Sequence, residues 1–316
     1  MNFQTKIPLE KQSKNLISYN SNIFLLGSCF SENIGDKLSY YKFKNLQNPF
    51  GILFHPLGIE QLLLHAINEK TYIEDDVFYH NEQWHCFDAH SKLSHVSKAV
   101  LLDTLNKQVE VVRKQIIKSN QIIITLGTSW VYRFIETDTV VTNCHKMPQK
   151  KFLKELLSID DLVGALQSII ALIKSVNKEV SILFTVSPVR HIKDGFIENM
   201  QSKSHLVSAI HQVVELRNNI FYFPSYEIMM DELRDYRFYK EDMIHPNQTA
   251  INYIWERFKN IWIDDNVLNT LEEVETVQKG LHHKPFNPKS EAHLKFLKNL
   301  EVKKNKLQSQ YSHILF

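Results

Sequence analysis

Near its amino terminus the chain reads Ile23-Phe24-Leu25-Leu26-Gly27-Ser28-Cys29-Phe30-Ser31-Glu32-Asn33-Ile34-Gly35. The four apolar residues before Gly27 indicate a buried strand, because the run is too short for a buried helix. From Ser31 onward apolar residues recur at helical spacing, and either Ser28 or Ser31 suits the cap of that helix. Ser28 is therefore predicted where a strand meets a helix. This position favours a nucleophile, since backbone N–H groups would meet the anion formed on attack. A serine that only caps the helix is the alternative.

The composition is that of an ordinary globular chain. Hydrophobic residues make up 43% and charged residues 23% of the 316 positions, and the net charge is +2. This balance gives no bulk attraction to nucleic acid. The three cysteines, Cys29, Cys86 and Cys144, are far apart and odd in number, which argues against a disulfide framework. No apolar run approaches a membrane span, and Met1 to Lys11 lacks the apolar core of a signal peptide. We expect a soluble, cytoplasmic protein.

Strands and helices alternate along most of the chain. Beyond the first unit, which ends in a helix over 31–41, we expect strands at 42–46, 121–126, 180–186 and 220–223. Further helices are expected from Pro56 onward and at 97–118, 159–176, 198–217 and 248–262. Such alternation implies parallel pairing with right-handed crossovers, and hence an α/β fold.

Several segments stand outside this alternation. Residues 77–88 are predicted to form a β-hairpin within an insertion at about 71–95. Residues 131–156 look irregular, and residues 1–20 are expected to form an irregular arm. The tail, 263–316, is expected to be helical and to dock through Leu294, Leu297 and Leu300. No boundary divides the body, so we expect one domain over 1–316 with its core at about 20–262.

Polar residues follow each predicted strand. Ligands of parallel sheets bind outside the carboxyl ends of the strands, so these residues are site candidates. A Ser, a His and an Asp on separate loops at one edge are the parts of an acyl-transfer site. The candidates in chain order are Ser28, Asn48, Gly51, Ser129, Trp130, Arg190, His191, Asp242 and His245.

Five motifs together carry a resemblance to a known family. GSCF, LGTSWVYR, NCHKMP, TVSPVRH and DMIHPN, in this order, resemble the GSCFA-domain proteins over about residues 20–262. That family is similar to the SGNH/GDSL hydrolases. The resemblance implies a three-layer α/β/α sandwich around a flavodoxin-like parallel sheet, and ester chemistry that needs no cofactor.

The resemblance also implies roles for individual residues. Ser28 matches the nucleophile, His245 the general base and Asp242 the carboxylate that orients the base. The N–H groups of Ser28 and Gly51 match the oxyanion donors.

One block departs from the SGNH pattern. SGNH enzymes usually have GxND there, whereas this chain has Gly127-Thr128-Ser129-Trp130. Ser129 takes the place of an oxyanion-binding Asn, and a hydroxyl is shorter than an amide and rotates freely. Asn143 and Asn48 are the alternative sources of an amide.

Other polar and aromatic side chains are candidates for substrate binding. These are Asn48, Trp130, His145, Arg190 and His191. The guanidinium of Arg190 suits a carboxylate or phosphate, and a salt bridge within its loop is the alternative. Specificity is expected from the hairpin 77–88 and the loop 131–150.

The histidines give no metal pattern. His80, His85, His90 and His95 recur every five residues, which does not keep them on one face of a helix. No cysteine or carboxylate pattern completes a zinc site, so we predict no metal.

The sequence therefore favours a serine esterase or acyltransferase acting on a small-molecule or glycan ester, such as an O-acetyl or other acyl-carbohydrate. The alternative is a non-catalytic ligand-binding module on the same scaffold, which the altered third block supports. A nucleotide-binding protein is less favoured, because the first loop lacks G-x-G-x-x-G or Walker spacing. Oligomeric state is left open.

Overall fold

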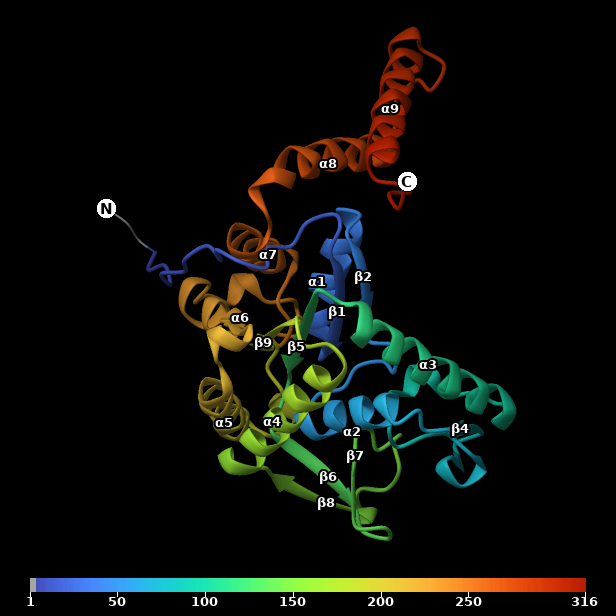
Figure 1. Cartoon of the computed structure of the whole chain (residues 1–316), viewed down its shortest axis with the longest axis vertical. Coiled ribbons are helices and arrows are strands. Elements are labelled where there is room, and N and C mark those ends of the chain that lie inside the picture. Colours follow the sequence, from blue (N-terminus) through green and yellow to red (C-terminus); the bar gives the residue numbers. More distant parts are fainter. Residues whose placement is uncertain (1–3) are drawn as a thin grey trace.

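The computed structural model describes residues 4–316 and is built around a five-stranded parallel sheet (Figure 1). Its strands are β1 (Asn22–Gly27), β2 (Lys44–Gln47), β5 (Gln121–Leu126), β9 (Ser181–Val186) and β10 (Ile220–Phe223). They lie in the order β10-β9-β5-β1-β2, and every neighbouring pair is parallel. This is the flavodoxin-like order, so the predicted fold class is confirmed.

Helices cover both faces of the sheet, because successive residues of a buried strand point to opposite sides. Phe24 and Leu26 belong to one apolar core, and Ile23 and Leu25 to the other. The first core includes residues of α2 (Pro56–Ile67), α3 (Lys98–Lys118), α4 (Ile159–Val176) and α5 (Phe196–Val213). The second includes residues of α1 (Cys29–Tyr40), α7 (Gln248–Trp262) and α8 (Leu268–His282). The predicted three layers are therefore present.

The predicted hairpin is also present, as the antiparallel pair β3 (Phe78–His80) and β4 (Gln83–His85). The irregular structure predicted for 131–156 is wrong. This segment largely forms an antiparallel sheet of β6 (Trp130–Phe134), β7 (Thr139–Val141) and β8 (Phe152–Leu156), which lies at the bottom of Figure 1. Its aromatic and β-branched residues suit a half-buried pleated surface. The burial comes partly from Phe87, a residue distant in sequence.

Two helical predictions need correction. The helix expected at 198–217 begins at Phe196 and ends at Val213, because Glu215 bridges to Ile220 at the start of β10. In the tail, Leu300 of α9 (Glu291–Gln310) is buried, but Leu294 and Leu297 are 55% and 43% exposed. The second buried residue of α9 is Leu307, so the helix contacts the protein through a narrower stripe than predicted.

The amino-terminal arm and the C-terminal helices lie in the upper part of Figure 1, far from the β6–β7–β8 sheet. Figure 1 shows α8 and α9 projecting from the body at the top of the view. Residues 4–20 contain no helix or strand, although Ile17 forms a β-bridge with Ile263. Residues 1–3 of the predicted arm lie outside the described residues. None of the described helices combines the length and the apolar character needed to cross a membrane.

Candidate functional site

Ser28 lies at the turn between β1 and α1. Gly27 has a φ of +126°, and a Cβ there would lie 2.1 Å from the Thr125 carbonyl oxygen, so only glycine fits. Ser28 is the N-cap of α1, and its Oγ accepts a hydrogen bond of 3.3 Å from the Phe30 N–H. The capping role is therefore observed. The side chain is fully buried, so an ester must displace covering side chains before it reaches Oγ.

Asp242 and His245 form a hydrogen-bonded pair on one tight loop. Asp242 Oδ1 accepts from the N–H groups of Ile244 and His245 at 2.9 and 3.0 Å, and Oδ2 lies 2.7 Å from His245 Nδ1. These bonds favour the carboxylate. The backbone N–H of His245, then that of Ile244, then the His245 ring lower the pKa of Asp242 to about 2. The arrangement leaves Nε2 of His245 as the ring atom that does not face the carboxylate.

The Asp242–His245 loop lies at the carboxyl edge of the sheet. The Arg190 N–H, which follows β9, donates to the Ile244 carbonyl at 3.2 Å. The charge of His245 also makes a small contribution to the lowered pKa of His191, the residue after Arg190. Within the described chain no hydrogen bond joins Ser28 Oγ to His245. The structure thus brings the three predicted catalytic residues to one edge of the sheet, with no hydrogen bond between Ser28 and His245 in the described chain.

Three of the predicted oxyanion donors already have partners. The Ser28 N–H donates to Thr125 O at 2.9 Å, and the Gly51 N–H donates to Asn48 O at 2.8 Å. Ser129 is fully buried, with its N–H and its Oγ both bonded to Ser202 of α5. The geometry does not offer Ser129 as a donor, because its hydrogen bonds hold α5 against the end of β5.

The two candidate amides differ in availability. Asn143 lies on the loop after β7, where its Oδ1 accepts from the His145 N–H at 2.8 Å. Asn48 follows β2, and its Oδ1 accepts from the Gly27 N–H at 2.9 Å. Its Nδ2 is buried and has no hydrogen-bond partner among the described residues. A buried amide donor without a partner is costly, and among the described residues this one belongs to the side chain that contacts Gly27, the residue before Ser28.

The Nε2 atom of the half-buried His191 is a second buried polar atom without a hydrogen-bond partner at this edge, among the described residues. This atom lies 3.2 Å from the position of a Cβ on Gly127. Burial lowers the pKa of His191 to about 3, with smaller contributions from the charges of Lys203 and His245. The ring is therefore neutral at ordinary pH.

In the described part of the chain Arg190 forms no salt bridge, and its guanidinium instead contacts two tyrosine rings. Its guanidinium lies over the rings of Tyr239 and Tyr236, at 4.5 and 5.5 Å from their centroids. No ion pair to a carboxylate is formed by Arg190 in the described part of the chain. Cation–π contact thus replaces the intraloop salt bridge.

Lys203 is a site residue that the sequence prediction missed. It lies on α5 and is 1% exposed, and its Nζ donates to the carbonyls of Gly127 and Ser187 at 2.7 Å each. These carbonyls follow β5 and β9, so Lys203 joins the two loops. Burial lowers its pKa to about 7. The buried positions of α5 recur at helical spacing, and this periodicity indicates that Lys203 faces the core. These positions include Asn199, Ser202, Lys203, Leu206 and Ile210.

Lys203 is expected to make stability depend on pH. Its folded-state pKa lies below its unfolded value, so the unfolded chain binds more protons between about pH 7 and 10.5 and stability rises with pH across this window. From about pH 6 to 9 the free energy of unfolding of wild type should rise by roughly 2–3 kcal/mol relative to Lys203→Met. Urea unfolding of both proteins at each pH measures this difference. If the free energies of unfolding of wild type and Lys203→Met change with pH in parallel, Lys203 is not buried as described.

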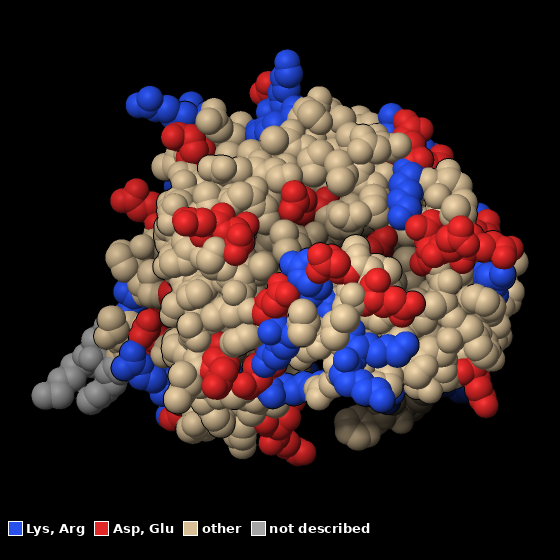
Figure 2. All heavy atoms as spheres, turned by 90° about the horizontal axis from the view of Figure 1, so that it is seen from below, with Lys and Arg blue, Asp and Glu red and all other residues tan. Residues whose placement is uncertain are grey.

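A cavity of about 350 Å³ lies beside this edge, between the β6–β7–β8 sheet and the loop after β9. Its lining includes Trp130, Asn143 and His145, three of the predicted ligand-binding residues. The His145 ring has structural contacts, since Nε2 lies 2.8 Å from Cys86 O and Nδ1 3.1 Å from Ser91 Oγ. Figure 2 shows the molecule from below, where charges of both signs are intermixed with a large uncharged surface.

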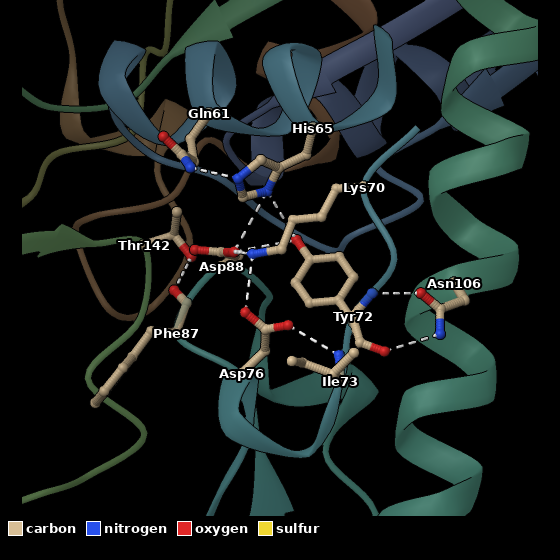
Figure 3. A network of polar contacts seen from close by, with 10 residues as sticks. All are labelled: Gln61, His65, Lys70, Tyr72, Ile73, Asp76, Phe87, Asp88, Asn106 and Thr142. Atoms are coloured by element: carbon tan, nitrogen blue, oxygen red, sulfur yellow. Dashed lines mark hydrogen bonds and ion pairs between the residues drawn. The ribbon is translucent and has the colours of Figure 1, made fainter. Parts of the chain in front are cut away.

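A second cavity, of about 490 Å³, borders α2 and the residues around the hairpin. Figure 3 shows its polar network, in which the Tyr72 hydroxyl donates to Asp88 at 3.1 Å and lies equally far from His65 Nδ1. Lys70 pairs with Asp76 at 2.9 Å and lies 3.9 Å from Asp88. These groups form hydrogen bonds and ion pairs with one another, and these contacts connect α2 to the segment before the hairpin.

A metal site is a separate question. Within residues 4–316 no group of three or more His, Cys, Asp or Glu side chains is placed to hold a metal ion.

Comparisons with known proteins agree with the motif order. A model described as the GSCFA family matches residues 22–258, and one described as the GSCFA domain protein, C-terminal domain, matches residues 274–316. No curated protein matches the chain.

Two solved structures are similar in fold. One is a carbohydrate esterase family 3 protein from Talaromyces cellulolyticus, with 7% identity, a TM-score of 0.39, and 80% of this chain and 99% of that chain covered. The other is an acetyl esterase mutant with acetate ion, with 7% identity, a TM-score of 0.38 and the same coverage.

Proposed function

This chain belongs to the GSCFA family, and we propose that it is a serine esterase or acyltransferase of the SGNH/GDSL type. The observation that carries the proposal is the pair of Asp242 and His245, whose Oδ2 and Nδ1 atoms are 2.7 Å apart, at the sheet edge where Ser28 follows β1. A carboxylate bonded to Nδ1 holds an imidazole in the tautomer whose Nε2 accepts a proton. That is the state a general base needs.

The proposed reaction has two steps. Ser28 Oγ attacks the ester carbonyl, and its proton passes to His245 Nε2 while Asp242 stabilises the imidazolium. The tetrahedral intermediate then collapses, the leaving alcohol takes the proton from His245, and an acyl-serine remains. Water or an acceptor hydroxyl attacks this ester, again with His245 as the base. The bond to Ser28 Oγ breaks, His245 returns the proton to Oγ, and an acid or a new ester is released. No cofactor enters either step.

We assign the oxyanion contact to Asn48 Nδ2. This donor is buried and has no partner within residues 4–316, whereas the N–H groups of Ser28 and Gly51 would have to exchange their present acceptors. Its oxygen accepts from Gly27, which fixes the amide in place beside Ser28. A donor that is already oriented stabilises a developing anion without reorganisation.

Asn48→Asp tests this assignment, because aspartate keeps the oxygen that Gly27 contacts and removes the donor. The φ of 43° at this position is tolerated by Asp as by Asn. We expect kcat to fall about 10²–10³-fold. Steady-state hydrolysis of 4-nitrophenyl acetate measures the change, with Asn20→Asp as the matched exposed control. A variant with wild-type kcat would remove Asn48 from the site.

A fluorophosphonate probe tests the proposal as a whole, since it reacts with activated serines. Mass mapping should find the label on Ser28, and Ser28→Ala should lose it while the exposed control Ser39→Ala keeps it. Folded wild-type protein that takes up no label, or takes it up elsewhere, would contradict the enzyme assignment.

The second candidate is a ligand-binding module on the same scaffold. The observation that favours it is the closed state of Ser28, whose side chain is fully buried and whose N–H is bonded to Thr125. Saturable binding of an ester without turnover or labelling would support this function.

A further inference from the structure

We propose that the cavity beside β6 binds an aromatic group that carries an anionic substituent. We call this cavity the aromatic pocket, and its ligand contacts are Phe54, Trp130, Tyr132, Phe152, Lys146 and Lys193. That this group is part of the substrate rests on the proposed function, whereas the binding itself does not. The pocket's shape, its charge and its position each support the inference.

Aromatic rings form much of the wall of the aromatic pocket. Tyr132 and Phe152 come from neighbouring strands and meet edge to face, with centroids 6.5 Å apart. Trp130 is fixed by a bond of 3.2 Å from its Nε1 to Glu198 O, and Lys154 Nζ lies over its ring at 4.3 Å. The volume of about 350 Å³ is that of a small-ligand site. Rigid rings favour a flat aromatic ligand, because ring stacking adds to apolar burial.

The charge of the pocket favours an anion. Lys146 and Lys193 line it, and no Asp or Glu does. Neither lysine forms an ion pair in residues 4–316, whereas nearby Asp194 is paired with Lys154 at 2.7 Å. Two unpaired cations beside apolar walls attract an anionic group and orient the ring that carries it. The larger cavity near α2 is different, since Asp75, Asp76 and Asp88 line it.

The aromatic pocket borders the proposed reaction centre. The Phe54 carbonyl accepts the N–H groups of Gly127 and Thr128 at 2.7 and 3.1 Å, and its ring packs on His191 with centroids 5.5 Å apart. The preceding residue, Leu53, donates to Gly27 O at 3.0 Å, next to Ser28. An aromatic group in the pocket would therefore lie beside the end of β1.

Binding is measured on Ser28→Ala, which lacks the proposed nucleophile. The result therefore does not depend on catalytic activity. Calorimetric titration with 2-naphthoate should show one saturable site, and neutral 2-naphthalenemethanol should bind about tenfold more weakly. In the same background, Lys193→Met should raise the Kd of 2-naphthoate about three- to tenfold. Trp130→Leu should weaken both ligands. Lys178→Met, an exposed lysine outside the pocket, is the matched control.

Absence of saturable binding, or equal Kd values for Lys193→Met and Lys178→Met, would overturn the inference. Because Lys193 is exposed, its substitution leaves the core intact and keeps the test valid if Trp130→Leu fails to fold. Failure of the proposed function would be detected in a separate assay. In that case wild-type protein would show no Ser28-dependent hydrolysis of 4-nitrophenyl acetate. Binding of 2-naphthoate without that hydrolysis would leave the pocket assignment standing.

Discussion

Ser28→Ala is expected to lower kcat for 4-nitrophenyl acetate by at least about 10⁴-fold, to the level that binding and oxyanion contacts alone sustain. The reason is chemical, since alanine offers no atom that can form the acyl intermediate. Steady-state and single-turnover kinetics on the purified protein measure the loss. Because the substitution also removes the N-cap of α1, a loss of about 1 kcal/mol in stability is expected as well.

The stability change has to be separated from the chemical one. Assays well below the midpoint of thermal unfolding keep both proteins folded, and the exposed Ser39→Ala provides a control with the same chemistry. If Ser28→Ala and wild type turn over at equal rates, Ser28 is not the nucleophile. The buried state of its hydroxyl would then reflect capping alone.

Asp242→Asn is expected to lower kcat about 10³–10⁴-fold with little change in KM. Asparagine keeps an oxygen for the N–H groups of Ile244 and His245, so the loop should retain its shape. It places an NH₂ group opposite His245 Nδ1, which forces the ring into the tautomer with its proton on Nε2. That tautomer cannot accept the proton of Ser28. The adjacent and exposed Glu241→Gln is the matched control.

The pH profile provides a second measurement for Asp242. Its hydrogen bonds lower the pKa of Asp242 to about 2, so the carboxylate stays ionised above roughly pH 4. Protonation of Asp242 itself should therefore not contribute to the acid limb of kcat/KM in wild type. An acid limb that persists unchanged, together with an unchanged kcat in Asp242→Asn, would exclude an orienting role.

The pattern of the sequence predicted most of the parallel sheet. Runs such as Ile122–Leu126 and Ile182–Val186 are apolar except for Thr125 and Thr185, which is typical of strands covered on both faces. Their order along the chain and the motifs after them were enough to place Ser28, Asn48, Arg190 and the Asp242–His245 loop at one edge. The pairing of Asp242 with His245 also follows from local spacing, because two residues three positions apart on one tight turn bring their side chains together.

The β6–β7–β8 sheet and the role of Ser129 were not predicted, and both have a long-range cause. Phe134 and Phe152 are buried through contact with Phe87 on another loop, so the local pattern of 131–156 lacks the evidence for its strands. Ser129 bonds to Ser202, which is 73 residues away. No motif in the sequence around Ser129 indicates that Ser202 is its partner.

Local patterns were thus sufficient to predict the strands and helices of a parallel α/β core, because these depend on the periodicity of neighbouring residues. The layer architecture and the candidate reactive residues were expected from the resemblance to the GSCFA-domain proteins. Three-dimensional packing established which donors are occupied and that Lys203 joins two loops. It also left Asn48 Nδ2 and His191 Nε2 buried without partners among the described residues. Burial and hydrogen bonding between distant segments exist only once the chain has folded, so they cannot be read from neighbouring residues.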